Sequence, residues 1–194
     1  MDVEIDRLAG KLRQIEEEME QLLEARRDAF RYRLEQNKVV FEQEVIEQHR
    51  RIRIGLIRFL RESPLVALVT APAVYALSVP LIMLDLWVAV YQLICFPIWG
   101  IARVQRSEYV VIDRHHLAYL NGVEKLNCVY CGYANGLIAL VREVASRTEQ
   151  YWCPIKHAMR IKDAHQRYNR FVDYGDAVGF RQRLEALRDE VRKS

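Results

Sequence analysis

The sequence predicts a mainly α-helical membrane protein, and three features of its 194 residues lead to that fold class. Residues 11–54 contain neither proline nor glycine, residues 65–102 contain one charged side chain, and three of the four cysteines then follow with metal-ligand spacing. The composition, 51% hydrophobic and 28% charged, excludes a disordered, collagen-like or disulfide-stapled chain. We expect a coiled-coil helix over 1–62, a membrane hairpin over 63–102, a small, mostly helical cytoplasmic metal-binding domain over 103–175 and an amphipathic helix over 176–194.

The N-terminal region predicts one long helix, because it is rich in Glu, Arg, Gln and Leu, which favour helices. A heptad pattern fits only from Ile5 to Leu22, after which Arg26 falls on the apolar seam. A spacing of eleven residues continues further and gives a nearly straight or slightly right-handed coiled coil. Such a helix needs a partner, so we expect a homo-oligomer. The two apolar rows of the eleven-residue repeat are Leu8, Met19, Phe30, Phe41 and Ile52, and Leu12, Leu23, Leu34, Val45 and Leu56.

The central stretch predicts a membrane-embedded segment. Residues 65–84 carry no charge and are long enough to cross about 30 Å of hydrocarbon. Arginines flank both ends of the stretch, and positive charge is retained on the cytoplasmic side. We therefore expect a transmembrane or re-entrant hairpin that turns near residues 80–85, with Asp85 at its tip and both termini in the cytoplasm, as in a bacterial inner membrane. A single tilted span is the alternative.

A basic segment, residues 50–61, precedes the apolar stretch and alternates arginine with isoleucine, leucine and phenylalanine. This pattern is typical of a helix that lies in the headgroup layer of a cytoplasmic leaflet. We favour lipid over nucleic acid as the partner of these arginines, because they adjoin the apolar stretch. The predicted membrane-interface residues are Arg50, Arg51, Arg53, Arg58 and Arg61.

The cysteines after the apolar stretch predict a metal site. Cys128, Cys131, Cys153 and His157 have the spacing C-x2-C-x21-C-x3-H, and three thiols with one imidazole suit a single zinc or iron ion. We expect zinc rather than iron. His115, His116 and Glu149 are possible substitutes for His157 as the fourth ligand.

The segment Cys128-Val-Tyr-Cys131-Gly132-Tyr133 resembles the first metal knuckle of rubredoxin-like and zinc-ribbon domains, and Cys153-Pro154 resembles the start of their second knuckle. The resemblance covers about eight residues and implies Cys128, Cys131 and Cys153 as metal ligands. The second knuckle lacks its own second cysteine, and the segment between the knuckles has helical rather than strand periodicity. A metal would in that case close two helices within residues 123–158.

The sequence contains no nucleophile–base set, phosphate-binding glycine loop or dinucleotide fingerprint. We therefore expect an assembly or scaffold protein rather than an enzyme, with a metal-stabilised head for an unidentified protein partner. The alternative is a membrane-bound redox or metal-handling protein that uses the thiolates for electron transfer, sensing or thiol exchange. Three unconnected buried cysteines, or a second metal held by nearby carboxylates, also remain open.

Overall fold

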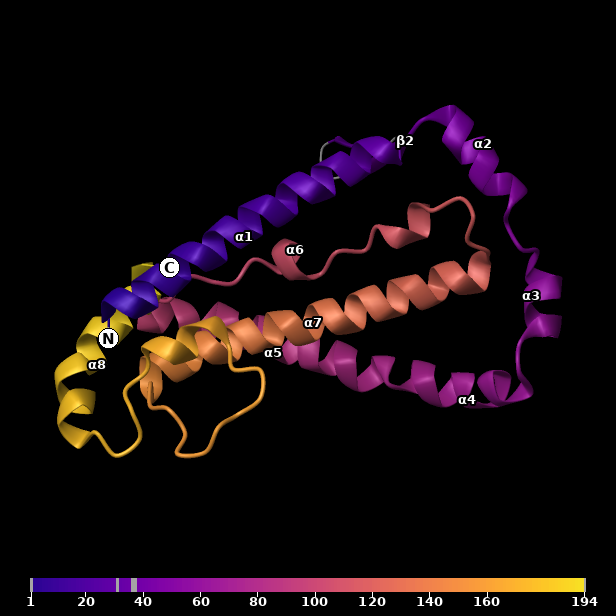
Figure 1. Ribbon diagram of the computed structural model, residues 1–194. Helices are drawn as coiled ribbons and strands as arrows, with labels where there is room; N and C mark the ends of the chain where they lie inside the picture. Colours follow the sequence, from indigo (N-terminus) through magenta and orange to yellow (C-terminus); the bar gives the residue numbers. More distant parts are fainter. Residues whose placement is uncertain (1, 31, 36–37, 194) are drawn as a thin grey trace. The chain divides into compact units, whose positions relative to one another are not determined.

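The computed structural model describes residues 2–30, 32–35 and 38–193, and it is mainly helical (Figure 1). The chain divides into two compact units. Unit 1 consists of the residues up to Arg61 together with Asp113–Lys125, and unit 2 consists of Glu62–Ile112 and the residues from Leu126 onward. Each unit is therefore built from segments that are distant in the sequence.

Unit 1 does not contain the single N-terminal helix that the sequence predicts. Helix α1 (Asp2–Ala29) is followed by an antiparallel hairpin of strands β1 (Tyr32–Glu35) and β2 (Lys38–Phe41), and then by α2 (Gln43–Arg51). Helix α3 (Leu56–Glu62) begins just after Gly55. The predicted helix is interrupted by the strand hairpin, where the chain is rich in β-branched and aromatic residues that favour strands. It is interrupted again next to Gly55.

The eleven-residue repeat is consequently wrong as a continuous pattern, because the hairpin interrupts both of its rows. The heptad pattern from Ile5 to Leu22, in contrast, lies entirely within α1. Within α1 the heptad positions Ile15, Met19 and Leu22 are 60%, 57% and 69% exposed. Helix α1 thus presents an apolar row that unit 1 itself does not cover at these positions.

The predicted membrane hairpin is also absent from the structure. Helix α4 (Leu65–Ala76) is followed after one residue by α5 (Ser78–Trp99), and the two form one helical segment over Leu65–Trp99. Pro80 lies in the first turn of α5, where its missing N–H is not needed, so it does not make a turn. With one continuous helix, the hairpin argument for placing both termini in the cytoplasm no longer applies.

The rest of unit 2 packs on α5. Gly100 ends α5 in the left-handed conformation that glycine adopts at low cost, and the chain continues through the short α6 (Arg106–Tyr109). Helix α7 (Gly122–Trp152) begins in unit 1 and continues through unit 2, and α8 (Ala177–Lys193) follows it. Two 3-10 helices, η1 (Arg114–His116) and η2 (Gln166–Arg170), lie in the connections.

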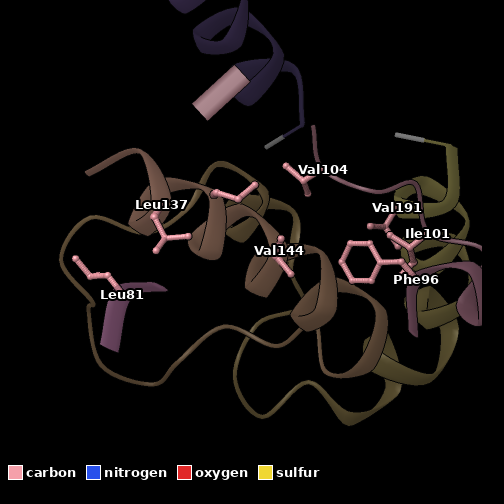
Figure 2. Close-up of a cluster of buried hydrophobic side chains, with 8 residues drawn as sticks. Leu81, Phe96, Ile101, Val104, Leu137, Val144 and Val191 are labelled. Atoms are coloured by element: carbon pink, nitrogen blue, oxygen red, sulfur yellow. The ribbon is translucent and has the colours of Figure 1, made fainter. Parts of the chain in front are cut away.

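Helices α5 and α7 lie side by side and run in the same direction (Figure 1). The Tyr91 hydroxyl is 2.8 Å from the Thr148 hydroxyl, and further along both helices the rings of Trp99 and Tyr151 stack with centroids 5.6 Å apart. The core of unit 2 is formed by these two helices together with α8 and the segment after Gly100 (Figure 2). Its buried side chains are Leu81, Phe96, Ile101, Val104, Leu137, Leu140, Val144 and Val191.

Candidate functional site

The structure does not bring the predicted metal ligands together within one chain. Cys128 and Cys131 lie in the first half of α7, whereas Cys153 follows directly after its end. At about 1.5 Å per residue, α7 separates Cys131 from Cys153 by roughly 33 Å, and a zinc ion holds its sulfur ligands at about 2.3 Å. Among the residues that the structure describes, no group of three or more His, Cys, Asp and Glu side chains is placed to hold a metal ion.

Cys153 and His157 have surroundings that do not favour metal binding. Burial raises the pKa of the Cys153 thiol, and the nearby Glu149 carboxylate raises this pKa further, whereas metals bind the thiolate. The ring of His157 stacks against Tyr168, and its backbone N–H donates to the Tyr168 hydroxyl at 2.6 Å. These residues therefore do not fit a single four-ligand ion. The segment between the knuckles is helical, and a single helix, α7, takes the place of the two helices considered within residues 123–158.

The substitute ligands have other contacts. His115 and His116 lie in η1 with ring centroids 3.9 Å apart, and both belong to unit 1. Glu149, in unit 2, accepts a hydrogen bond from His165 Nε2 at 2.9 Å. The predicted zinc or iron ion stays an untested prediction.

The most extensive candidate surface is the apolar helix α4–α5. Its 35 residues are long and apolar enough to cross a membrane, and only 6% of its apolar window is buried inside the protein. Helix α4 exposes apolar side chains along most of its length, whereas α5 covers one side with α7. The large apolar side chains that remain exposed on α5 are Val79, Ile82, Met83, Leu84, Leu86, Trp87, Val90, Leu93, Ile94 and Ile98.

The charge of Asp85, the single charged group of this helix, is neutralised by Arg106 of α6, and Tyr133 of α7 adds a hydrogen bond. Arg106 Nη2 donates to Asp85 Oδ2 at 2.6 Å, and the Tyr133 hydroxyl donates to the same oxygen at 3.0 Å. The Asp85 side chain is 19% exposed, so these partners replace much of the water that it would otherwise need. The expected position of Asp85 at the tip of a hairpin is therefore wrong. Through these two hydrogen bonds, Asp85 joins α5 to α6 and α7.

Polar side chains on the apolar helices bond to backbone within the same helix or to a neighbouring helix. The hydroxyl of Thr70 donates to the Val66 carbonyl, and the Asn135 amide donates to the Cys131 carbonyl, both four residues earlier. The Tyr75 hydroxyl donates to the Asn127 side-chain oxygen of α7. Residues 126–141 of α7, which face this part of α4–α5, contain no charged side chain. Thr70, Tyr75 and Asn135 therefore have hydrogen-bond partners within the protein, as polar side chains in an apolar environment require.

After the uncharged residues 126–141, the next charged side chain of α7 is Arg142. Charged side chains in the second half of α7 then form a network. Glu143 Oε1 accepts hydrogen bonds from Arg147 Nε and from Arg167 Nη2 of η2, both at 2.8 Å. Arg147 also donates to the carbonyl of Ala102. Burial alone would raise the pKa of Glu143, but the hydrogen bonds and charges of Arg167 and Arg147 together lower it. The network ties α7 to two connecting segments.

Sequence reasoning missed Arg106, Tyr133 and Gly136. A lone acidic residue in an apolar stretch indicates that a cation is needed, but several arginines follow and their spacing does not identify Arg106. Gly136 matters because a Cβ there would lie 2.5 Å from the Tyr109 carbonyl oxygen. No protein-family model, curated protein or solved structure compared with this chain gave a match, so function is inferred from the residues themselves.

Proposed function

We propose that the protein is a membrane-anchored assembly protein, held in the bilayer by α4–α5. One observation carries the proposal: a 35-residue helix with a single, neutralised charge buries only 6% of its apolar window inside the protein. Burying a side chain such as leucine or valine contributes roughly 1.5–3 kcal/mol. Exposed apolar surface on this scale is unfavourable in water and matches a lipid environment.

The charge pattern indicates which part of the helix lies in hydrocarbon. At about 1.5 Å per residue the helix is roughly 52 Å long, which exceeds the about 30 Å of a bilayer core. Residues 65–84 and the facing residues 126–141 of α7 are free of charge, and Asp85 with Arg106 follows. We place residues 65–84 in the hydrocarbon and the Asp85–Arg106 pair at its boundary.

Helix α1 supplies the assembly function in this proposal. Its exposed heptad row, Ile15, Met19 and Leu22, fits a second copy of α1 in a coiled coil. In a parallel pair, Lys11 of one chain faces Glu16 of the other across the flanking heptad positions, which favours pairing. The separation of Cys131 from Cys153 along α7 disfavours the form of the redox or metal-handling alternative that needs one metal ion held by all three cysteines.

Membrane fractionation of a variant with two charges on α4 tests the anchor. Val66 and Val69 are 71% and 70% exposed, so Val66→Asp with Val69→Asp should leave the folded chain intact in detergent. An aspartate costs roughly 2.5–3.5 kcal/mol at the centre of a membrane helix and less near its end, where Val66 and Val69 lie, so the variant carries two of them. We expect the unmodified protein in the alkali-washed membrane fraction and the variant largely released from it.

The matched control places the same substitutions on equally exposed apolar residues outside the proposed anchor. Met159 and Val178 are 81% and 67% exposed, and Met159→Asp with Val178→Asp should leave the protein in the membrane. Recovery of the unmodified protein in the soluble fraction would refute the anchor. Equal release of both variants would show that the effect is not specific to α4.

A further inference from the structure

Unit 1 contains a cavity of about 660 Å³ that the anchor and the coiled coil do not use. It is formed where the end of β2 and helix α2 meet the segment from η1 to the start of α7, all within the one unit. His49 holds the two sides together, because its ring contacts Phe41 on one side and Tyr119 on the other, with centroids 5.4 and 5.0 Å away. The cavity is lined by Phe41, Gln43, Ile46, Arg50, Arg53, His116, Ala118 and Lys125.

The charged side chains that line this cavity, among the residues the structure describes, are all basic. Arg50, Arg53 and Lys125 each contribute a positive charge, His116 contributes an imidazole, and no carboxylate is among these described lining residues. Within the described part of the chain, no carboxylate forms an ion pair with Arg50, Arg53 or Lys125. Three cations that share a cavity repel one another, and an anion in the cavity would relieve that repulsion.

We infer that this cavity binds a phosphate group carried by a ligand with an adjoining apolar part. The planar guanidinium groups of Arg50 and Arg53 match the geometry of phosphate oxygens, and Lys125 adds a compact charge with three donors. Gln43 can donate from its amide, and His116 can donate from its ring. Phe41, Ile46 and Ala118 form an apolar wall that suits the rest of the ligand. This site stands independently of the membrane anchor.

The same phosphate chemistry has two sources, a lipid headgroup and a soluble phosphate ester, and titration calorimetry separates them. The detergent-purified full chain is titrated with sn-glycerol 3-phosphate in one arm and with short-chain phosphatidic acid in the other. Binding in both arms indicates a soluble phosphate ester, and binding of phosphatidic acid alone indicates a lipid. We expect about one site per chain in at least one arm, with an affinity that falls as salt is added.

Matched variants assign the binding to the cavity. Arg50→Gln and Arg53→Gln should each weaken binding about tenfold or more, because each removes a charge-assisted hydrogen-bond donor. Arg51→Gln changes the net charge equally at a residue between them that does not line the cavity, and it should bind like the unmodified chain. No binding in either arm, or equal weakening by all three substitutions, overturns the proposal.

A second measurement uses the unmodified chain, so that it does not depend on how the variants fold. Lysine acetylation is followed by mass spectrometry with and without the ligand that binds more tightly. We expect bound ligand to protect Lys125 but not Lys11, which is exposed on α1 and does not line the cavity. Equal protection of both lysines, or of neither, contradicts the site.

Discussion

Glu143 illustrates at the scale of single residues how unit 2 handles a buried charge. Its carboxylate is 21% exposed and accepts hydrogen bonds from two arginines that are themselves 12% and 20% exposed. Asp85 follows the same rule with Arg106 and Tyr133. In both places at least one partner comes from a different segment, Arg167 for Glu143 and Arg106 for Asp85, so each charge also fixes the position of a connection against a helix.

Replacing Glu143 by glutamine tests this role. Glu143→Gln leaves two arginines without their counter-charge, and we expect it to lower the free energy of unfolding at neutral pH by about 2–3 kcal/mol. The ordinary pKa of 4.5 is lowered in the folded protein, so the stabilisation is present above about pH 4.5 and is lost as the pH falls through the folded pKa. The variant should therefore lose part of the acid sensitivity that the unmodified protein shows in chemical unfolding.

The control for this measurement is Glu185→Gln. Glu185 pairs with Arg188 at 2.6 Å but is 70% exposed, so water screens the pair and its loss should change stability by less than about 1 kcal/mol. A similar loss of stability in both variants would mean that burial of the Glu143 network is unimportant.

At the scale of elements, close packing of α7 depends on a glycine rather than on helix propensity. A Cβ on Gly136 would lie 2.5 Å from the Tyr109 carbonyl oxygen and 2.8 Å from Val110 Cα. Both atoms belong to backbone, which cannot move aside cheaply. Glycine costs about 1 kcal/mol relative to alanine inside a helix, so the structure gives up helix propensity here to bring α7 against the segment after α6.

Two alanine substitutions separate packing from propensity. Gly136→Ala should destabilise unit 2 by about 1–3 kcal/mol net, because the overlap outweighs the gain in helix propensity. Gly10→Ala, in α1, has no atom within 4 Å of the new Cβ and should stabilise α1 by up to about 1 kcal/mol. Thermal unfolding followed by circular dichroism measures both. A stabilising effect of Gly136→Ala would contradict the close approach.

At the scale of the whole molecule, the uncovered apolar row of α1 predicts self-association. Leu22→Glu places a charge in the heptad seam, and we expect it to weaken the oligomer at least about tenfold in sedimentation equilibrium of the detergent-solubilised chain. Gln21→Glu adds the same charge one residue away, outside the seam, and should leave the oligomer unchanged. An unmodified chain that is already monomeric at all accessible concentrations would rule out assembly through α1.

Local patterns in the sequence were sufficient for some elements. The helical character of residues 122–152 was predictable in part from the apolar periodicity after Asn135, and α8 from the row Phe180, Leu184, Leu187 and Val191. The apolar stretch was evident because a long run without charge depends only on composition. Eleven-residue spacing was misleading, because apolar residues at the right spacing occur in a strand hairpin as well as in a helix.

The sequence by itself determined that the chain is mainly helical and that residues 65–102 form a single apolar stretch with one charge, since these properties depend on composition and on near neighbours. Only the tertiary structure decided that Asp85 pairs with Arg106, that α7 keeps Cys131 from Cys153, and that Arg50, Arg53 and Lys125 line one cavity. These outcomes depend on which distant segments meet. A spacing pattern describes neighbours along the chain, whereas packing of whole helices fixes contacts between residues far apart in it.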